Sequence, residues 1–353
     1  LVSLETPPNA LSGTAAALAG SVYASMREVF PAVAAAPGTR GVLLGGHDAG
    51  AVTLDPRVLA ERWRARGVSS EVFLPELFEV LFPPERVKGF TADLRRIARG
   101  LAASRDARPA AFLHALALRQ QTASGSSGAW LAGLARAPAW MLLLAVAGPS
   151  LLVFVVAGGR RVRRPGRTAG ALPAVHALAA TGACGMIWGL LLLFSFQTRA
   201  GALYGQLGAL TGLFMAGLGL GGWAGIAATR RWGVRAMPSV ALAFAMLLPV
   251  ALHVVDAWTG MPRAAAFTIH GLLIATAGLA TGGVVPAATA VLARAGRDTV
   301  SIGAALEAAD HGGAAVGALA GAMVLIPVLG LPVAAGVLAL VQGLSAATVA
   351  IGS

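Results

Sequence analysis

Seven apolar runs follow one another from Pro138 onward, and they constrain the fold more than any other feature of this sequence. Each is close to the ~20 residues that an α-helix needs to cross the hydrocarbon core of a bilayer. The runs cover approximately residues 139–157, 173–195, 203–228, 237–256, 265–292, 303–326 and 331–351. With 57% apolar and only 12% charged residues, the chain is not an ordinary soluble protein. The sequence therefore predicts an α-helical transmembrane bundle of about seven spans.

The third run follows a short polar break at Gln197–Arg199 and is rich in glycine. The glycines of this region are Gly201, Gly205, Gly208, Gly212, Gly217, Gly219, Gly221, Gly222 and Gly225. Small residues at a spacing of three and four let helix backbones approach closely in lipid. A phosphate-binding loop would need a preceding strand and water, and the region offers neither. We therefore expect close helix packing here.

The formal net charge of +12 raises the question of a nucleic-acid partner. Eight of the twelve excess positive charges lie after residue 137, where the basic residues are arginines in the loops between apolar runs. Arginine in such loops sets the orientation of a membrane protein instead of binding nucleic acid. We therefore expect the lipid bilayer as the partner, and no nucleic acid.

The loop arginines also predict the orientation of the chain, because cytoplasmic loops are enriched in Arg and Lys. Only Arg199 and Arg263 lie on one side of the expected bundle, against ten arginines on the other. The ten are Arg160, Arg161, Arg163, Arg164, Arg167, Arg230, Arg231, Arg235, Arg294 and Arg297. If 139–157 crosses the membrane, residues 1–137 lie on the non-cytoplasmic face of a bacterial-type inner (cytoplasmic) membrane.

Residues 1–137 have a different pattern, typical of part of an α/β domain. The expected elements are a strand over 1–5, an amphipathic helix over 12–30, a buried strand over 41–45, a helix capped by Asp55, and helices over 74–81 and 85–102. These elements are too few to close a sheet. We divide the chain into a partial α/β domain at 1–120, a flexible polar linker at 121–137 and a membrane domain at 138–353.

The only cysteine, Cys184, lies inside an apolar run, so the chain has no intrachain disulfide and no cysteine-based metal site. The first residues have neither the basic start nor the long apolar core of a signal peptide. We therefore expect that the chain begins inside a longer polypeptide or after a cleavage. The lone histidines are expected to be interfacial or hydrogen-bonded residues, not ligands, at positions 176, 253 and 270.

Glu307, Asp310 and His311 form the one polar group inside an apolar run. Glu307 and His311 are four residues apart and share a helix face, and Asp310 lies on the adjacent face. Ionisable residues within a membrane span mark functional sites by default, so a proton relay, an ion site or a headgroup partner is one hypothesis. The alternative is that they lie in the first turns of the helix and cap or pair there. One helix supplies too few ligands for a metal site.

The order of several short motifs resembles the membrane-embedded spermidine synthase-like proteins, in which an aminopropyltransferase-type α/β domain is joined to membrane spans. The segments that carry this resemblance are 9–31, 37–48, 54–62, 106–113, Phe196-Gln197 with Tyr204, 214–218, 282–286 and 308–312. The resemblance implies that residues 1–120 are the C-terminal part of a Rossmann-like, methyltransferase-type domain. It covers nearly the whole chain through the serial order of its motifs.

The resemblance also implies what this chain lacks. The family's glycine-rich nucleoside-binding loop, its ribose-binding acidic residue and its catalytic aspartates all lie upstream of Leu1. We therefore expect no catalytic and no cofactor-binding residue here. Decarboxylated S-adenosylmethionine would bind only where the upstream half is present, as a fragment or a partner chain that completes the domain.

Two other functions are open on the sequence alone. One is an accessory or scaffold subunit that anchors a larger membrane complex. The other is a secondary transporter, in which the Gly-Gly-x-x-Pro break at 282–286 and the group at Glu307, Asp310 and His311 would form parts of a substrate path.

Overall fold

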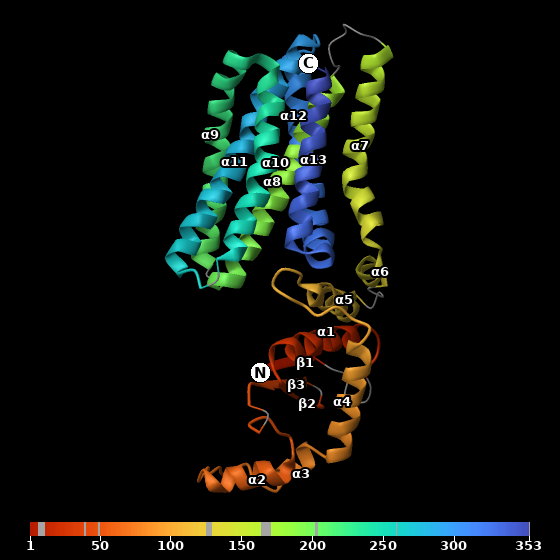
Figure 1. Ribbon diagram of the computed structural model, residues 1–353, viewed down its shortest axis with the longest axis vertical. Coiled ribbons are helices and arrows are strands. Elements are labelled where there is room, and N and C mark those ends of the chain that lie inside the picture. The colour runs from red at the N-terminus through yellow and green to blue at the C-terminus, as the bar shows by residue number, and fades with distance from the viewer. Residues whose placement is uncertain are drawn as a thin grey trace. The chain divides into compact units, whose positions relative to one another are not determined.

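The computed structural model of the protein describes residues 1–5, 11–38, 40–48, 50–124, 129–163, 171–201, 204–258 and 260–352. The chain divides into two compact units, Leu1–Arg136 and Ala137–Ser353 (Figure 1). We call the first the extramembrane unit and the second the membrane unit. The division falls one residue before the position at which the apolar runs predict the membrane domain to begin.

The extramembrane unit is built on a sheet of three strands, β1 (Val2–Glu5), β2 (Ala32–Ala36) and β3 (Arg40–Gly46), in the order β1-β3-β2. The central strand β3 runs antiparallel to both neighbours, so that β1 and β2 run parallel to each other. Helix α1 (Gly13–Val29) lies between β1 and β2 in the chain. The strand over 1–5 and the helix over 12–30 are therefore confirmed.

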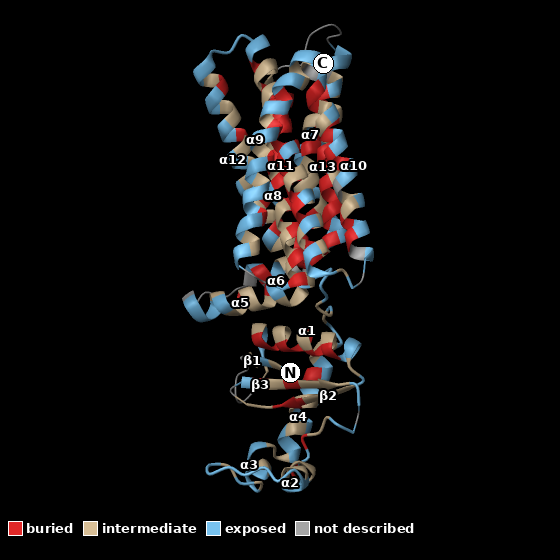
Figure 2. Cartoon of the chain, turned by 90° about the vertical axis from the view of Figure 1, so that its left-hand side faces the viewer, coloured by how far each residue is buried: buried red, intermediate tan, exposed pale blue. Residues whose placement is uncertain are grey.

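A small apolar core lies between α1 and the sheet. Tyr23 and Met26 of α1, Leu43 of β3 and Leu94 of helix α4 (Pro84–Ala98) are all buried in it. In Figure 2 the buried residues of α1, in red, face the sheet. Burial of these side chains is the main stabilising contribution to a unit of this size.

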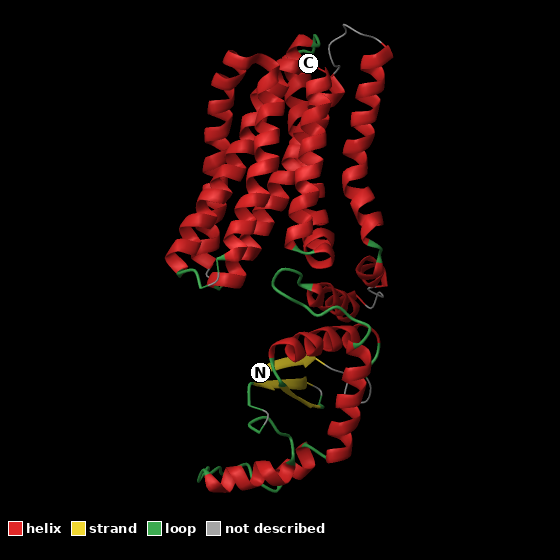
Figure 3. Cartoon of the chain, in the orientation of Figure 1, coloured by secondary structure: helices red, strands yellow, loops and turns green. Residues whose placement is uncertain are grey.

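The strand expected over 41–45 is present as β3, at the centre of the sheet. The strand β2 was not predicted, because its sequence Ala-Val-Ala-Ala-Ala lacks the β-branched alternation that marks a strand. Within the described residues the only sheet is this small antiparallel one, without a clear Rossmann fold (Figure 3).

Short helices make up the rest of the extramembrane unit. They are α2 (Pro56–Ala65), α3 (Leu77–Leu81), α4, α5 (Ala110–Ser124) and α6 (Ala129–Arg136). The predicted cap is confirmed, since the Asp55 side chain accepts a hydrogen bond from the Arg57 N–H at 2.9 Å. The predicted linker at 121–137 holds the end of α5 and all of α6, while 125–128 lie outside the described residues.

One stripe of α1 holds the segment that precedes α5. The Ser21 hydroxyl donates to the Ala102 carbonyl at 2.9 Å, and Ser25 Oγ accepts from the Ser104 N–H at 2.8 Å. One turn further along, the Glu28 carboxylate pairs with both sides of the Arg105 guanidinium at 2.8 and 2.9 Å. These contacts fix the run at 106–109 that the family resemblance singles out.

The membrane unit confirms the prediction of a multi-pass membrane protein. Seven helical segments among the described residues are long and apolar enough to cross a membrane. They are α7 (Ala139–Arg163), α8 (Ala171–Ala200), α9 (Tyr204–Trp232), α10 (Ala236–Ala257), α11 (Arg263–Arg294), α12 (Thr299–Ala320) continued by the π-helical η2 (Gly321–Leu329), and α13 (Leu331–Gly352). A 3-10 turn, η1 (Gly233–Arg235), joins α9 to α10.

Helices α8 and α11 are the most buried of the seven, and α7 is the least. Trp188, Leu191 and Phe196 of α8 lie at the centre of the main apolar cluster, with Ile274 of α11 and Leu338 of α13 around them. Successive helices alternate in direction, so that their connections lie at the two ends of the bundle (Figure 1).

The expected glycine packing is confirmed for one stripe of α9. A Cβ added at Gly217, Gly221 or Gly225 would collide with the backbone of Ala275, Leu279 or Gly283 on α11. Gly278 and Gly282 of α11 are held in the same way against the backbone of α9. The other glycines of α9 have no atom within 4 Å of an added Cβ: Gly205, Gly208, Gly212, Gly219 and Gly222. Only the stripe that faces α11 therefore depends on the absence of a side chain.

Candidate functional site

The arginines of the membrane unit gather at one end of the bundle. Because the helices alternate in direction, the last turns of α7, α9 and α11 lie at the same end (Figure 1). The described arginines of this end are Arg160, Arg161, Arg163, Arg230, Arg231, Arg235, Arg294 and Arg297. Arg199 and Arg263 lie at the opposite end, where the Arg199 guanidinium donates to the Trp258 carbonyl at 3.2 Å. Arg164 and Arg167 lie outside the described residues.

The three ionisable residues of α12 lie in the third and fourth turns of the helix. At 1.5 Å per residue from Thr299, Glu307 is about 12 Å and Asp310 about 16 Å along the helix. The cap of α12 is a different residue, Asp298, whose side chain accepts from the Ser301 N–H at 3.0 Å. This hydrogen bond from the backbone N–H of Ser301 lowers the pKa of the Asp298 carboxyl. Asp298 therefore caps α12, a role that the sequence analysis considered for Glu307, Asp310 and His311.

Asp310 is placed against α8 at a glycine. A Cβ on Gly182 would stand 2.7 Å from the Asp310 carbonyl oxygen and 2.8 Å from its Oδ1. The same side of α12 continues as Gly313 and Gly317, which pack on the backbone of α8. Glycine at 182 thus makes the room in which the half-buried Asp310 carboxyl group lies.

Glu307 and His311 lie on the other side of α12 and are exposed. His311 Nδ1 is 3.9 Å from Asp310 Oδ2, which is too long for a hydrogen bond. The predicted shared face of Glu307 and His311 is therefore present, but Asp310 points to a different neighbour. Among the described residues, no three His, Cys, Asp or Glu side chains are close enough to hold a metal ion.

The exposure of Glu307 and His311 has an energetic consequence. Ionisable side chains within a membrane span almost always face protein or water. The described residues provide no hydrogen-bond partner for either side chain, so we expect Glu307 and His311 to face another protein chain or water.

A buried histidine joins α11 to α8, a contact that the sequence did not indicate. His270 is fully buried, with Nδ1 2.7 Å from the Ala266 carbonyl and Nε2 3.2 Å from Ser195 Oγ. Because a carbonyl oxygen only accepts, Nδ1 carries the proton and Nε2 is left to accept from the Ser195 hydroxyl. The ring also contacts Phe196, with centroids 5.6 Å apart. These contacts confirm that His270 is hydrogen-bonded.

A second buried polar contact joins α13 to α8. The Gln342 amide donates to Thr181 Oγ1 at 2.9 Å, and Thr181 in turn donates to the Ala177 carbonyl. Gln342 Oε1 and Ser345 Oγ are buried one turn apart, and neither has a hydrogen-bond partner in the described part of the chain. Gln342 is the one amide side chain in the apolar run at 331–351, which indicates a buried hydrogen bond. The sequence alone does not identify the helix that provides its partner. The contact fixes the register of α13 against α8.

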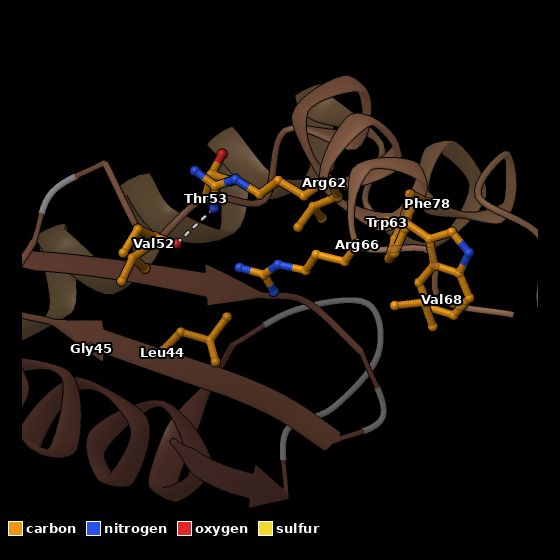
Figure 4. Close-up of a pocket in the computed structure, with 11 residues that line it drawn as sticks. Leu44, Gly45, Val52, Thr53, Arg62, Trp63, Arg66, Val68 and Phe78 are labelled. Atoms are coloured by element: carbon orange, nitrogen blue, oxygen red, sulfur yellow. Dashed lines mark hydrogen bonds between the residues drawn. The ribbon is translucent and has the colours of Figure 1, made fainter.

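The extramembrane unit contains a cleft of about 360 Å³ between β3 and α2 (Figure 4). The Arg62 guanidinium lies at its rim and donates to the Ala51 carbonyl at 2.9 Å. In Figure 4 the Arg66 side chain reaches toward Leu44 and Val52. Apolar walls and guanidinium groups suit an organic anion, but the residues that line the cleft include no carboxylate, histidine or cysteine. The cleft therefore has no acid–base group for catalysis.

The remaining polar candidates of the extramembrane unit have local partners. Asp48 Oδ1 accepts from the Gly50 N–H at 2.8 Å, which closes a tight turn. Arg105 and Arg108 exchange backbone hydrogen bonds of 2.8 and 3.0 Å around residues 106 and 107. Comparison with protein-family models, curated proteins and solved structures finds no match to this chain.

Proposed function

We propose that this chain is the membrane-anchored, C-terminal part of a spermidine synthase-like protein, and that it is not catalytic by itself. The observation that carries the proposal is the arrangement of β1, α1 and β2. A strand, a helix and a second strand parallel to the first form the unit from which α/β domains are built. The segments that resemble the family's late helix and following strand, 9–31 and 37–48, contain α1 and β3.

The sheet also offers an edge to which a larger domain can be added. Strand β1 pairs with β3 on one side, and no described strand pairs with its other side. Its side chains Val2 and Leu4 already pack on the apolar core of the unit. An open strand edge is a template for pairing with another strand. The upstream half of the domain, as a fragment or a partner chain, fits this position and would hold decarboxylated S-adenosylmethionine.

The distribution of arginines supports the second part of the proposal, that this chain is not catalytic. Arginine-rich ends are typically cytoplasmic. The extramembrane unit precedes α7, and the arginine-rich end of α7 is its last turn. The unit would then lie on the non-cytoplasmic face of a bacterial-type inner membrane, away from a cytosolic nucleoside donor. A non-catalytic role is consistent with this orientation.

A second candidate function is an accessory subunit of a larger membrane complex. The observation in its favour is the pair of exposed ionisable residues, Glu307 and His311, on a membrane-spanning helix. A scaffold helix that contacts another chain, whether a second copy of this one or a different subunit, would place these side chains against protein.

Purification of the native assembly from its own membranes tests these functions. We expect a co-purifying chain or upstream segment that carries a glycine-rich loop and the family's aspartates. An assembly whose other chains have no nucleotide-binding domain would favour the accessory subunit. The complete assembly is then incubated with labelled decarboxylated S-adenosylmethionine and putrescine. Absence of transfer by a complete assembly would exclude an aminopropyltransferase.

A further inference from the structure

One face of α12 is exposed along its whole length, and we call it the α12 outer face. Its members recur every three or four residues and are mostly small, apart from one acidic and one basic residue near the middle. They are Val300, Gly303, Ala304, Glu307, Ala308, His311, Gly312, Ala315, Val316 and Leu319. An entirely lipid-facing surface would be apolar throughout, so this composition points to a protein neighbour.

The acidic and basic residues of this face lack neighbours at the depth where they lie. Glu307 makes no ion pair or hydrogen bond with any described residue, and His311 has only the 3.9 Å contact with Asp310. Counted along the helix from Thr299, Glu307 is about 12 Å and His311 about 18 Å from its start.

We propose that the α12 outer face is where two copies of this chain pair within the membrane. Copies inserted in the same orientation are related by a two-fold axis along the membrane normal, so α12 meets α12 in parallel and the face meets itself. Glu307 and His311 are one turn apart. In two parallel helices residues of equal number lie at the same height, so Glu307 of one copy lies one turn, about 6 Å along the axis, from the partner's His311. Each side chain leans along the interface to the opposite residue of the partner, which forms two acid–base pairs in each dimer. A ring N–H of His311 donates to the carboxylate whether or not the ring is charged.

The small residues of the α12 outer face also suit contact with a second copy of α12. A Cβ added at Gly303 or Gly312 has no atom within 4 Å, so these positions are open to a second helix. Small residues at this spacing allow helices to pack closely in lipid. The inner side of α12 already packs on α8 in this way, through Gly313 and Gly317. This inference does not depend on the proposed enzyme family.

Cysteine cross-linking in native membranes tests the pairing. Cys184, the only cysteine, is first replaced by Ala, and Ala308→Cys is introduced between the two ionisable residues. Mild oxidation is expected to give a disulfide-linked dimer of the full chain. Leu220→Cys, on an exposed position of α9, is the matched control and should stay monomeric. Equal yields at the two positions, or a link from position 308 to a different protein, would overturn the proposal.

The second measurement changes Glu307 and His311 in the protein that carries Ala308→Cys and again determines the yield of cross-linked dimer. Glu307→Gln and His311→Gln should each lower the dimer yield about threefold to tenfold, as expected for loss of interhelical hydrogen bonds. The exchanged variant with Glu307→His and His311→Glu recreates both pairs and should restore the yield. Both side chains are exposed, so these variants leave the packing of the bundle unchanged. If the single variants cross-link normally, or the exchange fails to restore cross-linking, the pairing is wrong.

Discussion

The two units of this protein are held together by different contacts. Both units bury large side chains, such as Tyr23 and Leu94 in one and Trp188 and Phe196 in the other. The extramembrane unit also has four exposed ion pairs among its described residues. In the described part of the membrane unit, the corresponding charged contact is only that of Asp310 with His311 at 3.9 Å. Its closest helix contact, between α9 and α11, joins glycines to backbone.

The difference follows from the two solvents. In water, burial of apolar side chains stabilises a fold, and surface charges remain hydrated. In lipid, apolar side chains gain little from leaving the solvent, so helices associate through close packing and a few buried hydrogen bonds. At the glycine contacts of the bundle a larger side chain should therefore destabilise the packing, whereas in the core of the extramembrane unit a smaller side chain should do so.

The largest effect is expected from adding a side chain at Gly221. Its Cβ would collide with the carbonyl of Leu279, and backbone cannot move aside as a side chain can. Overpacking against side chains costs about 1–3 kcal/mol, and Gly221→Leu should exceed this range and separate α9 from α11. We expect little monodisperse protein on size-exclusion chromatography in detergent.

Gly219 provides the matched control for this substitution. It lies two residues away on the same helix, is exposed, and has no atom within 4 Å of an added Cβ. Gly219→Leu should be recovered at the wild-type yield with the same elution volume. If the two variants behave alike, close backbone packing does not hold α9 on α11.

The next largest effect is expected from removing a side chain in the extramembrane unit. Leu94 is fully buried against α1 and the sheet, so Leu94→Ala should lower the free energy of unfolding of this unit by about 3 kcal/mol. Hydrogen exchange of α1 peptides in the full chain measures the loss. Val80→Ala, at an exposed position of α3, is the control and should change exchange little. Equal protection in the two variants would contradict a core at Leu94.

The sequence predicted the membrane unit better than the extramembrane unit, for a physical reason. Seven apolar runs of membrane length allow only helices, because lipid leaves no partner for an unpaired backbone. In the extramembrane unit, β2 is almost all alanine, and its pairing with β3 depends on contacts between residues distant in sequence. Helix α6 lay in a segment whose polar beginning predicted a linker.

The candidate site shows the same limit at the level of single residues. Helical spacing was enough to place Glu307 and His311 on one face of α12. The position of Asp310 against Gly182 depends on which helix packs beside α12, and spacing carries no information about that. For the same reason, the partners of His270 and Gln342 on α8 could not be predicted.

A smaller effect is expected at Ser25, whose Oγ accepts from the Ser104 N–H. Ser25→Ala leaves this N–H without its partner, so the segment at 101–108 should lose about 1 kcal/mol of local stability. Hydrogen exchange of peptides from this segment measures it. Ser12→Ala, at the start of α1, is the control because the Ser12 side chain makes no capping hydrogen bond. Faster exchange with Ser12→Ala than with Ser25→Ala would contradict the assignment.

The smallest effect is expected at Glu28, and it should depend on pH. Hydrogen bonds from the Arg105 guanidinium lower the pKa of the Glu28 carboxyl below its ordinary value of 4.5. A group whose pKa is lowered by folding contributes stability above its unfolded pKa, and this contribution is lost as the pH falls through the folded pKa. Since the pair is exposed, the contribution is small and is screened by salt.

Glu28→Gln should therefore speed hydrogen exchange in 101–108 slightly at neutral pH and have no effect well below pH 4, where the wild-type carboxyl is protonated. The intrinsic pH dependence of exchange is removed by comparing the two proteins at each pH. Glu79→Gln, at an exposed position with no ion pair among the described residues, is the control and should match the wild type throughout. A difference between Glu28→Gln and wild type that persists unchanged into acid would show that Arg105 does not stabilise the segment through the Glu28 charge. The segment at 101–108 would then be held on α1 by the hydrogen bonds of Ser21 and Ser25, which involve no charged side chain, as in the hydrogen-bonded helix contacts of the membrane unit.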